Sequence, residues 1–527
     1  MARFATRPLA WTMLSTVLVA CGEPASPPVG VLVDGLFDEW ATAATIVDDA
    51  PDATNSPVDF LSVQGLDEAG WLFLALDVGN EVTLQSLPGT VHLVLDTDAD
   101  GSTGGTLYGL DGIDLVVDFS QTVESSVEGR GLGFALRAVD RDGATTAIPR
   151  HSLDLIALPT SSAPRFEVRI SRRGATGVPP FGSRLRLAAV YAEAGVVLDQ
   201  TMVGSYTFRT APGEPAAPVL GGRLTKAPGS VRIAQWNVSW DNFPPQAEHF
   251  ARVLAAVEPD VILLDELPGE LNAGQVAMTS EELTGFFERA PLARLGTWRF
   301  VYGESGGYQR ALVAARERSI RPAEPLSRVR HPPGALEPLL ATAPPDLRRF
   351  LELDASSGPP AAGAWVDIAG REVLFVAMDL QSRGWLGSPR DLHRRVQATT
   401  IRDHIAAALG ATRAPVVVGG DLNLVGSRAP LFALVRGLDV DGSDLIAVDA
   451  ERLGERSLTT WRNPEDIFSP GRLDYVLISD AGLTVTNAFV FTTEDLDDAT
   501  LDRLGLAREL SLQLSDHLIS VVDIQPR

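Results

Sequence analysis

The chain has 527 residues, of which 45% are hydrophobic and 21% charged, so it is long enough for two or three domains with real cores. This balance excludes wholesale disorder and collagen-like structure. Acidic residues outnumber basic ones 68 to 44, and the net charge of −24 disfavours binding to nucleic acid or anionic membranes through bulk charge.

Residues 1–20 have the layout of a secretory signal, with two arginines, no acidic residue and then an apolar run. The run ends at Leu18-Val19-Ala20-Cys21, which resembles the lipobox of bacterial lipoproteins, where the cysteine becomes acylated. Cys21 is the only cysteine, so no intrachain disulfide can form. The resemblance implies an exported lipoprotein of the bacterial cell envelope with residues 21–30 as a tether, and Gly22 after the cysteine favours the outer membrane. The alternatives are an ordinary signal peptide with an incidental cysteine, or a soluble cytoplasmic protein with an apolar start.

No later segment has the run of about 18 apolar residues that a membrane-spanning helix needs. Anchoring at a membrane is therefore expected through the lipid alone.

Residues 31–212 predict an all-β sandwich domain, because short apolar runs alternate with turns rich in Gly and Asp. The expected strands lie at 71–76, 91–95, 115–119, 166–170, 185–192 and 196–201. Residues 213–230, rich in Pro, Gly and Ala, predict a linker.

Three carboxylates, Asp96, Asp98 and Asp100, alternate in one glycine-containing loop of this domain. Such a loop suits Ca²⁺, which prefers oxygen ligands, and it equally suits a polar turn between strands. An EF-hand is not supported, because the twelfth loop position is Leu107 rather than Glu.

The segments DGLFDEW (34–40) and LDTDADGSTG (95–104), with Asp114 after them, resemble sandwich modules related to family-nine carbohydrate-binding domains. That resemblance implies an accessory or ligand-binding role.

Residues 231–527 alternate strand-like and helix-like segments, which predicts an α/β domain. Five of its segments end on or contain polar side chains in apolar surroundings. They are WNV at 236–238, PDVILLDE at 259–266, GGDLN at 419–423, RLDYVLIS at 472–479 and SDH at 515–517.

In this order and spacing, the five motifs resemble the endonuclease/exonuclease/phosphatase superfamily, whose members share a deoxyribonuclease-like fold. The resemblance implies a four-layer fold, a two-sheet sandwich flanked by helices, with the site where strand ends meet at one edge.

The resemblance implies a divalent metal site of Mg²⁺ or Mn²⁺. It assigns Glu266 as metal ligand, with Asn237 beside it and Asp516 as a second carboxylate. Mg²⁺ fits such a set because it prefers few carboxylates and retains several waters.

The same resemblance assigns catalytic roles. Asp421 and Asn423, which face the same side of an extended segment, activate the water and hold a phosphate oxygen. His517 contacts the scissile phosphate, and Asp474 accepts a hydrogen bond from this histidine and favours its protonated form. Taken singly, Asp474 is better explained as a strand-end cap and His517 as a core or surface histidine, whereas the ordered set of motifs favours the catalytic roles.

Two positions depart from the family pattern. Asp379 stands where many relatives have His or Tyr, which leaves three interpretations: it binds a second cation, it is protonated by its acidic neighbours and acts as an acid, or the site is degenerate. Ser239 replaces an acidic residue of abasic-site endonucleases, which argues against a repair enzyme.

The sequence therefore predicts an exported, metal-dependent phosphoesterase whose substrate is nucleic acid, phospholipid or a sugar phosphate. A basic stretch at 390–397 either faces that substrate or is a solvated helical face. The alternative function is a non-catalytic surface protein with a ligand- or glycan-binding sandwich and a hydrolase scaffold.

Overall fold

A computed structural model describes residues 30–121, 130–214, 220, 222–270 and 276–527. The predicted signal peptide, Cys21 and parts of the predicted tether and linker lie outside the described residues. Residues 31–527 form one compact unit, to which the following description refers. No helix among the described residues is both long and apolar enough to cross a membrane.

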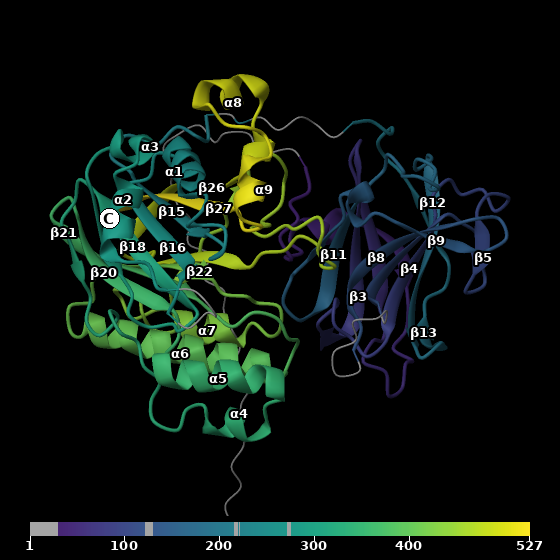
Figure 1. Ribbon diagram of the computed structural model, residues 1–527. Coiled ribbons are helices and arrows are strands. Elements are labelled where there is room, and N and C mark those ends of the chain that lie inside the picture. Colours follow the sequence, from purple (N-terminus) through teal and green to yellow (C-terminus); the bar gives the residue numbers. More distant parts are fainter. Residues whose placement is uncertain (1–29, 122–129, 215–219, 221, 271–275) are drawn as a thin grey trace, which may run out of the picture. The chain divides into compact units, whose positions relative to one another are not determined.

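Residues 44–207 form a sandwich of two antiparallel sheets (Figure 1). One sheet contains, in spatial order, β1 (Ala44–Asp48), β2 (Ser62–Asp67), β3 (Trp71–Val82), β11 (Ala163–Ser171) and β10 (Ile156–Leu158). The other contains β13 (Val196–Gln200), β12 (Arg184–Glu193), β4 (Thr90–Asp96), β7 (Leu115–Gln121), β8 (Leu132–Val139) and β9 (Thr145–Ile148), with β14 (Gly204–Thr207) also paired to β12. The hairpin β5 (Gly105–Leu107) and β6 (Leu110–Ile113) and the short helices η1 (Glu39–Thr42) and η2 (Arg150–Leu153) complete this part.

The two sheets of the sandwich pack against each other through every second side chain of their strands. Leu72, Leu74 and Leu76 of β3 share one core with Leu93 and Leu95 of β4, all nearly inaccessible to solvent. Because alternate residues of a strand point to the same face, this pattern buries one face of each sheet against the other. The predicted all-β fold is confirmed.

The C-terminal residues form two further sheets. The seven-stranded sheet contains, in spatial order, β17 (Trp298–Tyr302), β18 (Gln309–Arg316), β16 (Val261–Pro268), β15 (Val231–Asn237), β27 (Ile519–Pro526), β26 (Leu483–Phe491) and β24 (Glu451–Arg452). The six-stranded sheet contains β19 (Ile320–Pro322), β20 (Ala361–Ile368), β21 (Arg371–Asp379), β22 (Val416–Asp421), β25 (Asp474–Ile478) and β23 (Ile446–Ala447).

The two sheets pack face to face and helices cover their outer faces (Figure 1). Ile233 and Leu263 of one sheet share a buried layer with Phe375 and Val417 of the other. The seven-stranded sheet is covered by α1 (Ala247–Ala256), α2 (Ser280–Phe287), α3 (Ala290–Ala293), α8 (Asp498–Leu504) and α9 (Leu510–Leu514), with η3 (Thr493–Asp495). The six-stranded sheet is covered by α6 (Pro389–Leu409) and α7 (Ala429–Val435), and α4 (Glu337–Thr342) and α5 (Pro345–Ser357) lie beside α6. The predicted α/β fold of two sheets flanked by helices is confirmed.

The register of the strands brings polar residues to one edge. In the parallel pair β15 and β16, Asn237 lies opposite Asp265. In the six-stranded sheet Asp379 lies opposite Asp421, which in turn lies opposite Asp474. Four carboxylates and one amide thus meet where the strands end.

A glycine is needed at this edge. A side chain at Gly420 would place its Cβ 1.7 Å from the carbonyl oxygen of Met378. Such an approach is sterically forbidden, so glycine lets β22 run close beside β21 and brings Asp421 next to Asp379.

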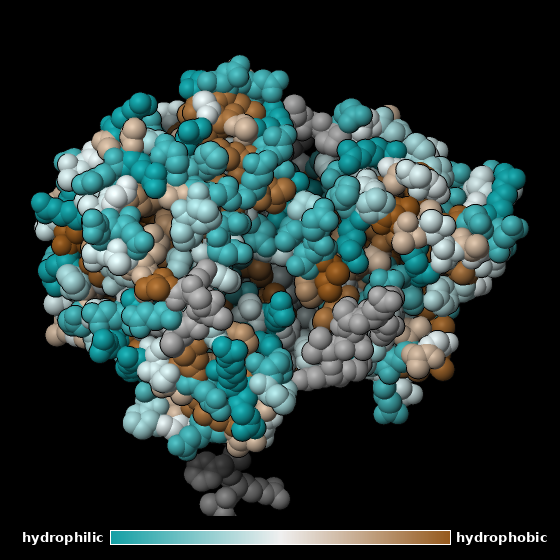
Figure 2. All heavy atoms as spheres, in the orientation of Figure 1, coloured by the Kyte–Doolittle hydropathy of each residue, from teal (hydrophilic) through white to brown (hydrophobic). Residues whose placement is uncertain are grey.

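On the face shown in Figure 2, hydrophilic residues predominate and hydrophobic ones occur in small groups. Scattered apolar side chains of this kind are normal on a water-exposed surface.

Candidate active site

A histidine between two carboxylates forms the centre of the site. His517 Nδ1 lies 2.8 Å from Asp474 Oδ2, and His517 Nε2 lies 3.7 Å from Asp421 Oδ2. Although burial opposes protonation, the charges of Asp474 and Asp421 raise the pKa of His517 well above its usual value. The two carboxylates therefore favour the protonated imidazole, and its Nε2 is directed at Asp421.

Asp421 lies in a network of amide donors. It accepts hydrogen bonds from the backbone N–H of Asn423 and from Asn423 Nδ2, both at 2.8 Å, and from Asn237 Nδ2 at 3.5 Å. Asn423 has a φ of 48°, a left-handed conformation that asparagine tolerates better than most residues. Burial raises the pKa of Asp421 to about 7, which suits a group that takes and releases a proton.

Glu266 follows the end of the apolar stretch of β16 and has a φ of 55°. Its carboxylate interacts with the amide groups of Asn237 and Gln309 and with the charges of His517 and Asp516. Burial raises its pKa above the ordinary glutamate value. Glu266, Asn237 and Asp516, the predicted metal residues, thus belong to one electrostatic cluster with His517.

Asp379 closes the cluster on the side of β21. Its side chain is 4% exposed, and Asn423 Nδ2 lies 3.5 Å from its Oδ1. Burial, together with the negative charges of Glu266, Asp421 and Asp265, raises the pKa of Asp379 well above the usual range. These surroundings favour the protonated form of the Asp379 carboxyl group.

Two buried residues of the site were not predicted from the sequence. Gln235 Nε2 donates to Asp265 Oδ1 at 3.2 Å and to Asp474 Oδ1 at 3.1 Å, and Asp265 Oδ2 accepts from the backbone N–H of Asp421 at 3.3 Å. Both are polar residues inside an otherwise apolar strand, and this pattern could have indicated them. A polar group in such a strand is buried, and a buried polar group needs hydrogen-bond partners.

A cleft of about 490 Å³ opens beside these residues, with Glu266, Asp379 and Asn423 in its lining. The lining also includes the exposed Arg349 and an aromatic pair, Tyr308 and Phe350, whose ring centroids lie 5.3 Å apart.

The basic stretch at 390–397 does not present a charged face to the cleft. Arg394 is fully buried and donates to the carbonyl oxygens of Gln381 and Arg383, while Arg390 pairs with Asp346. Neither predicted interpretation holds for Arg394, because its hydrogen bonds hold it inside the protein.

His393, in the same stretch, is also buried, and its Nε2 lies 2.5 Å from Asp354 Oδ2. The same oxygen lies 2.9 Å from His331 Nε2 and 3.1 Å from Gln397 Nε2. This second histidine and carboxylate cluster borders the cleft and was not predicted from the sequence.

The donor set fits a hard divalent cation. The carboxylates of Asp265, Glu266, Asp379 and Asp421 repel one another, and a bound cation would relieve that repulsion. Among the described residues, every group of three acids whose ligand atoms lie within 4.8 Å of one another belongs to the N-terminal part of the chain. The acids of the active site are therefore farther apart than this. A site with few carboxylates suits Mg²⁺ or Mn²⁺, since Mg²⁺ retains several waters.

Three acid groups lie in the sandwich, namely Asp34, Glu39 and Glu167; Asp52, Asp59 and Asp199; and Asp96, Asp98 and Asp114. The last differs from the predicted calcium loop, because Asp114 replaces Asp100 in it. The Asp100 carboxylate instead accepts hydrogen bonds from the backbone N–H and hydroxyl of Ser102. The pairing of β4 with β7 brings Asp114 beside Asp96, which the loop sequence alone does not indicate.

Comparisons with known proteins agree with the fold. A family model described as the endonuclease/exonuclease/phosphatase family matches residues 234–517, more than half of the chain. No curated protein matches the chain.

Three solved structures are similar to this chain. The human Nocturnin catalytic domain with bound sulfate is 15% identical, covering 57% of this chain and 97% of that one, with a TM-score of 0.35. ANGEL2, described as a 2′,3′-cyclic phosphatase, is 14% identical, covering 57% and 96%, with a TM-score of 0.36. An endonuclease/exonuclease/phosphatase from Bacteroides vulgatus is 13% identical, covering 56% and 99%, with a TM-score of 0.35.

Proposed function

The chain belongs to the endonuclease/exonuclease/phosphatase family, and on this premise we propose that its C-terminal half is a metal-dependent phosphoesterase. The observation that carries the proposal is the buried His517, paired with Asp474 and directed at Asp421 beside the Glu266 carboxylate. A structural scaffold has no need of such charges, because each buried carboxylate costs free energy unless it is paired or protonated.

Each residue has a distinct role in this proposal. Glu266, Asn237 and Asp516 would hold Mg²⁺ or Mn²⁺, which supplies positive charge to the phosphoester oxygens when bound. Asp421 takes the proton of the attacking water, and the Asn423 amide holds a phosphate oxygen. His517, kept protonated and oriented by Asp474, stabilises the negative charge that develops on the phosphoryl group.

For Asp379 we propose the role of proton donor to the leaving oxygen. The support is its raised pKa, its burial and its place in the lining of the cleft. A carboxyl group that keeps its proton does not repel the anionic substrate and can release that proton as the bond to the leaving group breaks.

The test is hydrolysis of bis-p-nitrophenyl phosphate, plasmid DNA and sphingomyelin by the purified protein with Mg²⁺, Mn²⁺ or EDTA. We expect turnover that EDTA abolishes and that Asp421→Ala and His517→Ala reduce by about 10² to 10⁴. Asp441→Ala, a change at an exposed surface turn, is the control and should leave the rate unchanged. Failure of the wild-type protein on every substrate with every metal would support the alternative of a non-catalytic scaffold.

We also propose that the sandwich binds Ca²⁺ through Asp96, Asp98 and Asp114. Asp96 is completely buried and its Oδ1 has no hydrogen-bond partner, while burial and the charges of Asp98 and Asp96 raise the pKa of Asp114 to about 6. A bound cation would give Asp96 Oδ1 a partner, and it would relieve the repulsion between Asp114 and its acidic neighbours.

Finally, we propose export as a lipoprotein acylated at Cys21, for which the support is the signal-like sequence of residues 1–21. The test is incorporation of labelled palmitate and recovery in the membrane fraction of the host. Cys21→Ser should abolish both, and a labelled Cys21→Ser protein would contradict the proposal.

A further inference from the structure

One loop touches both the candidate active site and the sandwich. It is the loop of residues 453–473 between β24 and β25, here called the β24–β25 loop. One side of it faces the segment that contains Asp516 and His517, and the other side contacts strands and turns of the sandwich.

On the active-site side, the loop holds the Asp516 segment at three points. Asn463 Nδ2 donates to Asp516 Oδ2 at 3.3 Å, and the backbone N–H of Arg462 donates to the Asp516 carbonyl at 2.8 Å. The backbone N–H of Leu518 donates to the Thr460 carbonyl at 2.7 Å. The position of Asp516 and of the neighbouring His517 is thereby tied to that of the loop.

The same loop also fixes the position of Asp474, the hydrogen-bond partner of His517. Thr460 Oγ1 accepts hydrogen bonds from the backbone N–H groups of Leu473 at 3.0 Å and Asp474 at 2.9 Å. Both members of the pair Asp474 and His517 therefore depend on the conformation around Thr460.

The N-terminal part contacts the other side of the loop through hydrogen bonds of backbone and amide groups. Val33 forms a parallel bridge with Ser457, with hydrogen bonds of 3.0 Å on each side of it. Gln85 makes two hydrogen bonds with Ser469, of 2.8 and 2.9 Å. These contacts fix the loop at both of its ends.

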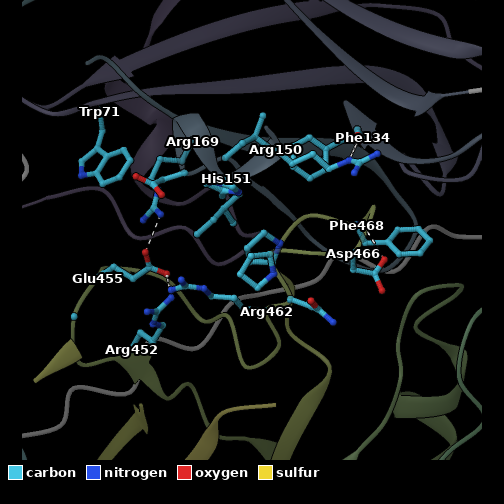
Figure 3. Close-up of a pocket in the computed structure, with 17 residues that line it drawn as sticks. Trp71, Phe134, Arg150, His151, Arg169, Arg452, Glu455, Arg462, Asp466 and Phe468 are labelled. Carbon is cyan, nitrogen blue, oxygen red and sulfur yellow. Dashed lines mark hydrogen bonds and ion pairs between the residues drawn. The ribbon is translucent and has the colours of Figure 1, made fainter. Parts of the chain in front are cut away.

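An ion pair formed by a buried arginine adds a charged contact (Figure 3). Arg169 of β11, 3% exposed, places Nη2 2.8 Å from Glu455 Oε2, and Glu455 Oε1 lies 2.7 Å from Arg452 Nη1. Arg452 in turn forms a bidentate pair with Asp495. Since Arg169 belongs to the sandwich and Glu455 to the loop, removing the arginine would leave a loop carboxylate with one of its two arginine partners.

Figure 3 shows that Arg169, Arg452 and Glu455 line a cavity, which also has lining residues from the sandwich and from the β24–β25 loop. Asn463 also belongs to its lining, so the cavity wall reaches from Arg169 to the residue that contacts Asp516.

We propose that the sandwich completes the catalytic centre, with Asn463 and Arg169 as positioning residues that place Asp516 and the pair of Asp474 and His517 through the β24–β25 loop. This inference rests on the proposed phosphoesterase function. It makes the N-terminal part a component of the active site rather than only an accessory module. Residues around a metal site that orient its ligands commonly change metal affinity by 10- to 100-fold when mutated.

The experiment measures Mn²⁺ affinity by electron paramagnetic resonance of the free ion, and kcat for bis-p-nitrophenyl phosphate, with the full-length chain. Asn463→Ala should weaken Mn²⁺ binding about 10- to 100-fold. Arg169→Leu should weaken it roughly 2- to 30-fold, and Arg169→Lys, which keeps the charge, should restore part of the loss. The double variant should lose less affinity than the sum of the two effects, because both act through one loop.

Arg173→Leu is the matched control, since Arg173 lies just beyond β11 and pairs with Asp154 on the surface, both about half exposed. It should bind Mn²⁺ like the wild type. Circular dichroism verifies that each variant is folded, and Gln85→Ala, which removes the contacts with Ser469, replaces Arg169→Leu if that variant does not fold.

The outcomes separate the two proposals. If the wild type does not bind Mn²⁺, the metal-dependent function fails and this inference with it. If the wild type binds Mn²⁺ and folded Arg169→Leu and Gln85→Ala bind it equally well, the positioning role of the sandwich is wrong while the proposed function stands.

Discussion

Asp474 Oδ2 and His517 Nδ1 lie 2.8 Å apart, although the two residues are 43 positions apart in the sequence. Asp474 also accepts a hydrogen bond from Gln235 through its other oxygen, so the carboxylate is fixed from two sides. A carboxylate held in this way orients the imidazole and favours its protonated form.

Asp474→Asn is therefore expected to lower kcat for bis-p-nitrophenyl phosphate by about 10² to 10⁴, with little change in KM. The amide keeps the shape of the side chain and removes the charge that holds His517 protonated. Steady-state kinetics check this result, with Asp441→Asn as a surface control. A variant with wild-type kcat would contradict the role of the pair.

The sequence predicted those site residues that end or follow apolar strands, because strand ends are where a polar side chain signals function. Asp421 and Glu266 are of this kind, while Asp474 begins the apolar strand β25, and the structure brings all three together with His517. The order of the strands in the sheets, which puts them side by side, could not be deduced from the separate motifs. The resemblance to a family implied only that strand ends meet at one edge.

Residues whose partners lie far away in sequence were missed. Asn463 lies in a loop without periodicity, and its contact with Asp516 depends on the folded position of that loop. Asp354 lies on α5, in a proline-rich region that gave no clear pattern, because Pro344 and Pro345 act as helix starters there rather than as breakers. Its two histidine partners come from residues 331 and 393, on either side of α5.

Asp379→Asn should separate substrates by their leaving groups. If Asp379 donates a proton to the leaving oxygen, kcat on plasmid DNA falls about 100-fold, because an alkoxide leaves poorly without a proton. With bis-p-nitrophenyl phosphate the loss should stay within about threefold, since p-nitrophenolate is a stable anion that needs little help from general-acid catalysis.

Equal losses on the two substrates would reject this role for Asp379. If the variant instead shows a lower cooperativity in its Mn²⁺ dependence, Asp379 is the ligand of a second cation.

Calcium should stabilise the sandwich. Ca²⁺ at about 100 times its dissociation constant is expected to add about 2.7 kcal/mol to the free energy of unfolding, because it binds the folded state alone. Thermal unfolding followed by circular dichroism, with and without Ca²⁺, measures this effect. Asp98→Asn should remove the response, since its carboxylate lies with those of Asp96 and Asp114.

Asp100→Asn is the matched variant for this test, because Asp100 lies in the same loop but outside the group of Asp96, Asp98 and Asp114. It should keep most of the response to Ca²⁺. A loss in Asp100→Asn with none in Asp98→Asn would place the ion elsewhere in the loop.

Glu167 should make the stability of the protein depend on pH. The side chain is 2% exposed and accepts a hydrogen bond from Trp40 Nε1 at 2.9 Å, and burial with the charges of Asp34 and Glu39 raises its pKa to about 8. Between the unfolded value near 4.5 and this folded value, the folded protein holds a proton that the unfolded chain releases. The free energy of unfolding therefore falls as pH rises through this window and levels off above it.

The size of this fall is about 2–5 kcal/mol for Glu167, since one pKa unit corresponds to about 1.4 kcal/mol. Urea unfolding at pH 5, 6, 7 and 8 measures the fall, which Glu167→Gln should reduce because glutamine does not titrate. Part of the fall in stability should persist in Glu167→Gln, since burial also raises the pKa of Asp34 to about 6. The exposed Glu214, changed to Gln, serves as the control. If Glu167→Gln and the wild type lose stability with the same slope, the Glu167 carboxylate is ionised in the folded protein, and the electrostatic account of this acid group is wrong.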